Sequence, residues 1–220
     1  MKKPSPTKKL HSKLLSFYYG NPAKDLKIIV ITSNTPTPLS TLVHNIITSS
    51  GEKSATIKPT STLSLHRSLS KAWRAGANFI VIDASANIIE KNTFCDLPIS
   101  VLVSYDISSP QDISPLLSRS PDFLILDRDN ASYPVLKDTK STTATKTFGH
   151  HRESDTRIDN FKPYKTAIEA RLTLGNRILD VAAFLTGDTA PSLLAAATTV
   201  ADLLGLDKDT IVDGLASYEP

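Results

Sequence analysis

The chain of 220 residues contains a single cysteine, Cys95, and 8 glycines. One cysteine excludes an internal disulfide, is typical of a reducing compartment and cannot form a metal site by itself. Glycine occurs at about half its usual frequency of roughly 7%, which leaves few residues for the ligand loops of a nucleotide-binding fold. The sequence also lacks an apolar run of about 18 residues and a signal-peptide-like segment. We therefore expect a cytoplasmic protein without a membrane span.

The remaining composition is that of a globular chain, with 40% hydrophobic and 21% charged residues. This length favours one large α/β domain over two small ones. The net charge is +3, and much of the positive charge lies near the start of the chain, at Lys2, Lys3, Lys8, Lys9 and Lys13. We predict a basic flexible tail over residues 1–9, which is either solvated or in contact with nucleic acid or anionic lipid. Because an aromatic and basic platform is missing, we expect no nucleic-acid partner.

Short β-branched runs alternate with helical patterns along most of the chain. The predicted strands cover residues 27–32, 54–58, 77–83, 99–104 and 121–126. The predicted helices cover residues 38–50, 64–74, 110–118, 189–204 and 207–217. This alternation predicts an α/β fold, a P-loop-like three-layer sandwich whose mainly parallel sheet has helices on both faces and right-handed crossovers.

Two further segments depart from this alternation. Residues 165–174 and 177–185 alternate apolar and polar side chains around Gly175-Asn176, which predicts an antiparallel hairpin near the C-terminal end. Residues 137–156 are rich in Ser, Thr and Lys and predict a polar surface loop with one short strand near 145–148. The pair His150-His151 lies in this loop without a cluster of other ligands, which argues against a metal site there.

A leading helix is expected over residues 8–19. Its apolar side chains have nearly helical spacing, and Gly20-Asn21-Pro22 supplies the residues that commonly end a helix. These apolar residues are Leu10, Leu14, Leu15, Phe17 and Tyr18. We interpret this segment as a helix that docks on the domain.

The first strand, the loop after it and the next helix follow the order in which P-loop proteins hold a phosphate. Such a loop uses glycines to expose backbone N–H groups, a lysine for the outer phosphates and a hydroxyl for Mg²⁺. Here Pro36 and Pro38 remove two N–H donors. The candidate phosphate-loop residues are Thr32, Ser33, Asn34, Thr35, Thr37, Ser40 and Thr41. They either bind an anion at the helix N-terminus or serve as turn and capping residues.

Three stretches together resemble the central, ATP-binding domain of Mur ligases, specifically the UDP-N-acetylmuramoyl-tripeptide synthetase type. They are the lead Leu14–Pro22 (LLSFYYGNP), the strand, loop and helix after it, and the closing stretch Leu204–Pro220 with its Leu-Gly-Leu turn. The family's loop reads V-T-G-T-N-G-K-T-T-T. This chain keeps Ile31 and Thr32 and then departs from the family's pattern. Ser33 and Pro36 stand at the glycines, Thr37 at the lysine and Pro38 at the following threonine.

The resemblance implies an ATP-dependent amide-forming ligase of peptidoglycan synthesis, in which Mg-ATP phosphorylates a carboxylate and an amino acid displaces the phosphate. Against the family's E-x-S-S-H motif, Asp83 and Ser85 are retained, and the histidine is not. A second motif retains Asp106 but neither histidine, and Leu193 replaces the adenine-side asparagine. We find no counterpart of the carbamylated lysine. The resemblance covers residues 10–220 as a single central domain, and the family's N- and C-terminal domains are expected to be absent.

The leading hypothesis is a catalytically inactive Mur-ligase-like domain that acts as a scaffold, regulator or partner subunit. Its expected partner is a complete Mur ligase or another cell-wall enzyme, and we predict no catalytic residue, no metal and no cofactor, with ATP and Mg²⁺ lost. One alternative is an anion- or small-molecule-binding module at the Thr32–Thr41 loop, and another is a residual ligase. Asp83 and Ser85 form a possible residual acidic site, although an aspartate there also suits a turn cap. Asp106 and Asp127 are expected to be solvated loop acids.

Overall fold

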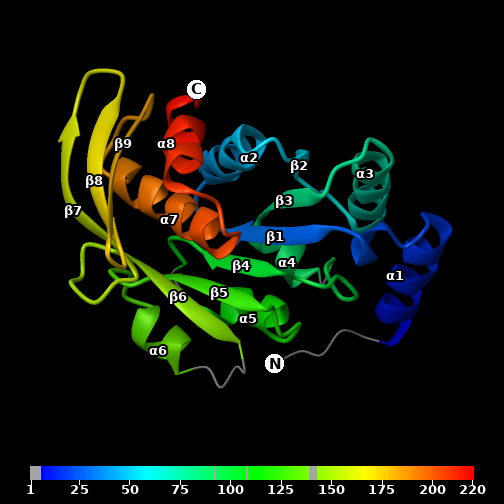
Figure 1. Ribbon diagram of the computed structural model, residues 1–220. Helices are drawn as coiled ribbons and strands as arrows, with labels where there is room; N and C mark the ends of the chain where they lie inside the picture. Colours follow the sequence, from blue (N-terminus) through cyan, green and yellow to red (C-terminus); the bar gives the residue numbers. More distant parts are fainter. Residues whose placement is uncertain (1–5, 92, 108, 139–142) are drawn as a thin grey trace.

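The computed structural model describes residues 6–91, 93–107, 109–138 and 143–220 (Figure 1). Its sheet has nine strands in the order β2-β3-β1-β4-β5-β6-β7-β8-β9, which are parallel from β2 to β7 and antiparallel from β7 to β9. The strands are β1 (Lys27–Thr32), β2 (Ser54–Ile57), β3 (Phe79–Ala84), β4 (Val101–Ser104), β5 (Phe123–Asp127), β6 (Ala144–Gly149), β7 (Thr156–Pro163), β8 (Ile168–Leu174) and β9 (Arg177–Ala183). The predicted strand over residues 27–32 matches β1. It could be predicted because a strand that is buried on both faces has a continuous β-branched run.

Helices cover both faces of this sheet, as predicted. They are α1 (Pro6–Tyr18), the 3-10 turn η1 (Pro22–Lys24), α2 (Leu39–Ser49), α3 (Thr62–Arg74), α4 (Ala86–Glu90), α5 (Pro110–Leu117), α6 (Tyr133–Lys137), α7 (Ala190–Leu203) and α8 (Lys208–Ala216). Helices α2, α7 and α8 share one apolar core with the sheet, and α3, α4, α5 and α6 share the other. The three-layer α/β prediction is therefore confirmed.

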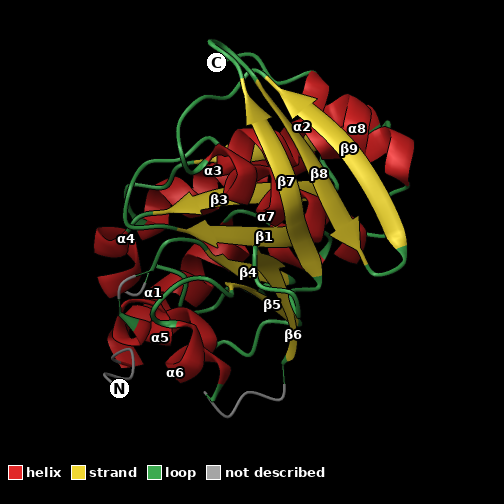
Figure 2. Cartoon of the chain, turned by 90° about the vertical axis from the view of Figure 1, so that its left-hand side faces the viewer, coloured by secondary structure: helices red, strands yellow, loops and turns green. Residues whose placement is uncertain are grey.

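The antiparallel end of the sheet is larger than the predicted hairpin. Strands β8 and β9 form that hairpin around Gly175, and β7 pairs with β8 in addition. Figure 2 shows the three strands side by side as a tall extension of the sheet. Strand β7 was not predicted because its residues after Ile158 are exposed, so it lacks an apolar alternation. A register shift between Ile158 and Asn160 adds a bulge to this strand.

The polar loop predicted over residues 137–156 contains more regular structure than expected. Within it, Lys137 ends α6, β6 extends over Ala144–Gly149, and Thr156 begins β7. Residues 139–142 lie outside the described residues. Helices α4 and α6 were not predicted, since each has 5 residues and too few turns for a periodic signal.

Helix α7 is alanine-rich and buried on nearly every side, as its composition indicates. Ala195, Ala196 and Ala197 are each 0% exposed, and the small side chains allow the helix to approach the sheet closely. Helix α8 packs on α2 through Gly214 and buries Ile211 and Leu215. In the described part of the chain, no helix combines the length and apolar character needed to cross a membrane.

The predicted leading helix is observed and contacts α3, but its apolar stripe is not the face that makes the buried contact. Helix α1 begins at Pro6, so residues 6–9 of the expected flexible tail are helical, and residues 1–5 are outside the described residues. The buried contact on α3 is a hydrogen bond between Ser12 Oγ and His66 Nε2 at 3.1 Å. The apolar stripe of α1 is instead exposed, by 59% at Leu10 and 77% at Phe17.

Candidate functional site

The carboxyl ends of the central parallel strands finish at the same edge of the sheet. Thr32, the last residue of β1, is in register with Ala84 of β3 and Ser104 of β4, and Ser104 is in register with Leu126 of β5. Open α/β sheets bind ligands at this edge. The loops that follow these strands therefore form the candidate functional site.

The loop between β1 and α2 carries most of the predicted phosphate-loop residues. Thr32 and Ser40 are buried, whereas Asn34, Thr35 and Thr41 are exposed, and Ser33 and Thr37 are half-buried. The Ser33 hydroxyl donates to the carbonyl oxygen of Thr35 at 2.6 Å, so it is engaged within the loop. All residues from 33 to 38 are described, and none of them has a positive φ. A backbone nest of converging N–H groups alternates right- and left-handed residues, and this loop does not supply that alternation.

Helix α2 begins after Pro38, which contributes no N–H group. The Pro38 carbonyl accepts from Thr41 N–H at 2.9 Å and from Leu42 N–H at 3.0 Å. No side chain in the described part of the chain caps this helix. The amides of Leu39 and Ser40 are therefore the donors that remain at its first turn, together with the positive end of the helix dipole.

The two residues of the possible acidic site at the end of β3 have different structural roles. Asp83 forms an ion pair, and Ser85 precedes a helix. Asp83 forms an ion pair with Lys58, which follows β2, at 3.2 Å between Oδ2 and Nζ. Asp83 lies two residues after Val81 in β3, so the two side chains point to the same face of the sheet. Val81 belongs to the core on the α2 face, and the Asp83 carboxylate is therefore directed to that face. Ser85 is the exposed N-cap residue of α4, and its backbone carbonyl accepts from Ile88 at 3.0 Å. The structure does not bring Ser85 and Asp83 together through a hydrogen bond.

A second group of acidic residues, Asp106, Asp127 and Asp129, lies at the ends of β4 and β5. The sequence analysis predicted the exposure of Asp106 correctly and that of Asp127 incorrectly. Asp106 is exposed as expected, but Asp127 is half-buried, and burial followed by repulsion from Asp129 and Asp106 raises its pKa to about 6. Asp127 Oδ1 accepts from Asp129 N–H at 3.0 Å. The prediction that Asp127 is a solvated loop acid is therefore wrong.

Tyr105 links this acidic group to α7. It is 3% exposed, its ring stacks on Phe148 at 6.0 Å between centroids, and its hydroxyl donates to the Thr189 carbonyl at 3.4 Å. Burial, together with the charge of Asp127, raises the pKa of the phenol. No sequence motif marked this tyrosine, because its burial depends on β6 and on the start of α7, which are distant in the sequence.

The backbone that follows β6 binds the carboxylate of Asp129. The N–H groups of His150 and His151 both donate to Asp129, the latter at 3.1 Å. Gly149 has a φ of 140°, and a Cβ there would lie 2.6 Å from Asp129 Oδ2, so this position requires glycine. The His150 ring packs on Phe161 with 6.1 Å between ring centroids. Both histidines thus hold Asp129 through their backbone rather than through their rings.

No group of three or more histidine, cysteine, aspartate or glutamate side chains among the described residues is arranged to hold a metal ion. Two pockets of about 560 and 650 Å³ lie on the antiparallel extension, and neither is lined by a residue of the 33–38 loop. The smaller pocket contains the ion pairs Lys146–Asp155 and Arg177–Asp202.

Comparison with solved structures identifies the fold. A UDP-N-acetylmuramoyl-L-alanyl-D-glutamate–2,6-diaminopimelate ligase matches with a TM-score of 0.82 at 18% identity, over 94% of this chain and 49% of the ligase. UDP-N-acetylmuramoylalanyl-D-glutamyl-2,6-diaminopimelate–D-alanyl-D-alanyl ligase from Acinetobacter baumannii matches with a TM-score of 0.78 at 15% identity, over 96% and 50%. The chain has a Mur-ligase-like fold.

Folylpolyglutamate synthase structures share this fold. Folylpolyglutamate synthase from Thermotoga maritima matches with a TM-score of 0.72 at 12% identity, over 95% of this chain and 62% of the synthase. The chain spans about half the length of the two Mur ligases. No protein-family model and no curated protein matches the sequence. At these identities, the likeness concerns the fold alone.

Proposed function

We propose that this chain is a Mur-ligase-like domain with a degenerate P-loop, which does not bind Mg-ATP and acts as a non-catalytic scaffold, regulator or partner subunit. The observation that carries the proposal is the loop between β1 and α2. It has prolines at 36 and 38, threonine at the position that the family resemblance assigns to lysine, and no residue with positive φ. Phosphoryl transfer depends on positioning and charge neutralisation, and these replacements remove both.

The surroundings of the loop support the same proposal. Asp83, the residue that the resemblance places at a Mg²⁺-linked position, is paired with Lys58. A cation already beside this carboxylate disfavours a second one, and the residues present do not fit Mg-ATP. The partner proposed is a complete Mur ligase or another cell-wall enzyme. A cytoplasmic location is also proposed, in accord with the free and buried Cys95.

Isothermal titration with Mg-ATP tests this function. We expect no measurable binding by the full chain, while a complete Mur ligase titrated under the same conditions serves as the positive control. Binding in the micromolar range that requires Mg²⁺ would overturn the proposal and restore the reading of a residual ATP-dependent ligase.

The uncapped start of α2 supports one alternative, an anion-binding module. Because Thr41 N–H is bonded to Pro38, the amides of Leu39 and Ser40 are the donors available to the anion. Soaking crystals in inorganic phosphate distinguishes the two functions. Anion density on these two amides supports the module, and an empty loop supports the scaffold.

A further inference from the structure

Helix α1 presents its apolar side chains to solvent rather than to the domain. Leu10 and Leu14 are each 59% exposed, Phe17 is 77% exposed, and Tyr18 is 79% exposed. Their spacing of i, i+4, i+7 and i+8 gathers them into one stripe that covers about 100° of the helix surface. The buried Ser12 lies on the opposite side and contacts His66 of α3. The helix is therefore attached by a polar face, and its apolar stripe is left without a partner in the described part of the chain.

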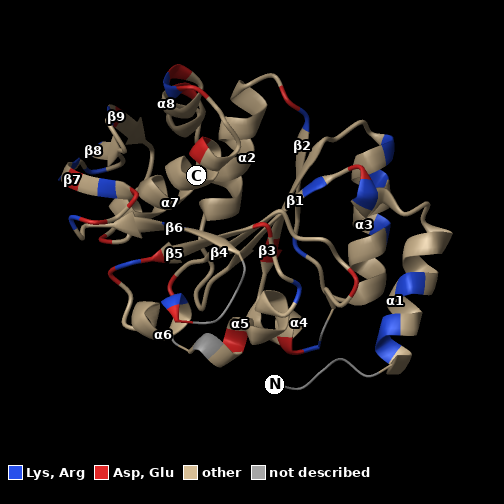
Figure 3. Cartoon of the chain, turned by 60° about the horizontal axis from the view of Figure 1, so that its bottom comes forward, with Lys and Arg blue, Asp and Glu red and all other residues tan. Residues whose placement is uncertain are grey.

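Lys9 and Lys13 lie along one side of this stripe, and acidic residues are missing from the two helices that form this end of the molecule. Lys8, Lys9 and Lys13 of α1 and Arg67, Lys71 and Arg74 of α3 are all exposed, and neither helix contains an aspartate or a glutamate. Since the whole chain has a net charge of +3, the residues outside these two helices have a net charge of −3. Figure 3 shows the basic residues on α1 and α3. The two helices thus contribute six positive charges and no negative one.

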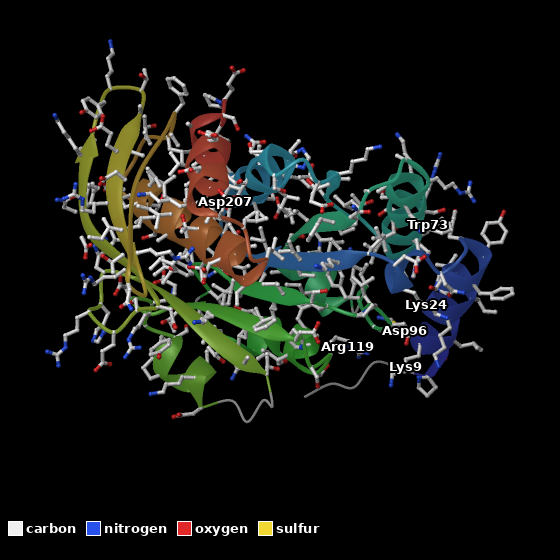
Figure 4. The ribbon with its side chains drawn as sticks, viewed as in Figure 1. Lys9, Lys24, Trp73, Asp96, Arg119 and Asp207 are labelled. Atoms are coloured by element: carbon white, nitrogen blue, oxygen red, sulfur yellow. The ribbon has the colours of Figure 1, made fainter. Side chains whose placement is uncertain are left out.

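Lys8 donates to the carbonyl oxygen of Lys91 at 3.3 Å, and the other five cations are available to an external anion. In the described part of the chain, no ion pair involves Lys9, Lys13, Arg67, Lys71 or Arg74. Lys9 and Lys13 are four residues apart, so they form a row along α1 beside the stripe. Figure 4 shows Lys9, Lys24 and Trp73 at this same end of the molecule, together with Asp96, and Trp73 is 36% exposed.

We propose that the α1 stripe, formed by Leu10, Leu14, Phe17 and Tyr18 with its flanking lysines, binds an anionic lipid surface. An apolar face with Leu and Phe beside a lysine-rich polar face is the pattern of helices that lie in a membrane interface. The apolar side chains enter the headgroup boundary, and the cations of α1 and α3 lie against anionic headgroups.

This inference is separate from the proposed function, and co-sedimentation of the full chain with lipid vesicles tests it. We expect binding to vesicles of phosphatidylcholine and phosphatidylglycerol, little binding to phosphatidylcholine alone, and loss of binding at high salt. The double variant Leu14→Ser/Phe17→Ser should bind at least about tenfold more weakly, because it removes two inserting side chains. Circular dichroism should show an unchanged fold, since both side chains are exposed.

The matched control uses apolar residues at the other end of the molecule. Ile178 is 54% and Phe184 is 52% exposed, and Ile178→Ser/Phe184→Ser should bind the vesicles like the wild-type chain. The proposal is overturned if binding ignores the anionic lipid or if the α1 double variant binds normally. It is also overturned if the wild-type chain binds no vesicles but self-associates in light scattering, and the α1 double variant does not self-associate. That result would make the stripe a protein interface.

Discussion

Asp127 is held at the end of β5 in a setting that disfavours its charge. The fold half-buries its carboxylate, and Asp106 and Asp129 are near enough to repel it, so its pKa is raised to about 6. An aspartate in an unfolded chain has a pKa of about 3.9. The unfolded chain therefore releases this proton at a lower pH than the folded one does. Stability contributed by the protonated carboxyl is complete below about pH 4 and is lost as the pH rises towards about 6.

Asp127→Asn should remove this loss of stability. The amide oxygen still accepts from Asp129 N–H, and the side chain has no charge to bury. We expect the free energy of unfolding to increase by about 1–2 kcal/mol at neutral pH, with little change below about pH 4. Urea denaturation at several pH values measures both. Asp122→Asn is the control, since Asp122 is exposed at the opposite end of β5, and a gain of equal size in that variant would contradict the explanation.

The candidate site also shows how far sequence can predict single residues. Thr32 and Asp83 could be located because each lies at or next to the end of a strand whose apolar run is unmistakable. The environment of Asp127 could not be predicted, since burial there depends on Tyr105, Phe148 and the start of α7, which meet only in the folded chain. Likewise, the pairing of Asp83 with Lys58 follows from the placement of β2 beside β3.

At the scale of elements, the contact between α2 and α8 depends on one glycine. A Cβ built on Gly214 would lie 2.4 Å from Ile46 Cα and 2.9 Å from its backbone nitrogen. A contact with backbone is not relieved by a change of rotamer, so the helices would have to separate.

Gly214→Ala should therefore destabilise the protein, although alanine is the better helix former by about 1 kcal/mol. We expect a net loss of about 2 kcal/mol in the free energy of unfolding, because overpacking exceeds the gain in helix propensity. Thermal unfolding measures it, with Asp213→Ala on the exposed face as a control that should change stability by less than about 0.5 kcal/mol. A Gly214→Ala protein as stable as the wild type would show that the two helices are not tightly packed.

The elements that sequence predicted best are those whose pattern is fixed by burial. Strand β1 and the hairpin β8–β9 have continuous or alternating apolar residues, so periodicity locates them. Strand β7 is mostly exposed, and its place in the sheet is set by pairing with β6 and β8. For α1, periodicity located the helix but did not show which face contacts the domain, and the apolar stripe is exposed.

At the scale of the whole molecule, the Mur-ligase-like fold is combined with a loop that has few of the features of a P-loop. Mixing the full chain with a complete Mur ligase and measuring the ligase rate tests the partner role. We expect the rate to change as the chain is added, since a regulator or partner subunit must act on its enzyme. Bovine serum albumin at the same concentration is the control, and an unchanged rate together with no co-elution would contradict a role with that enzyme.

The most direct test of the central claim is the midpoint of urea unfolding with and without millimolar Mg-ATP. A ligand present at about 1,000 times its Kd stabilises the folded state by about 4 kcal/mol, whatever its enthalpy of binding. A chain that does not bind Mg-ATP should unfold at the same urea concentration in both solutions. A midpoint that rises with Mg-ATP, and returns to its original value when EDTA removes the Mg²⁺, would contradict the claim that this fold has lost its nucleotide.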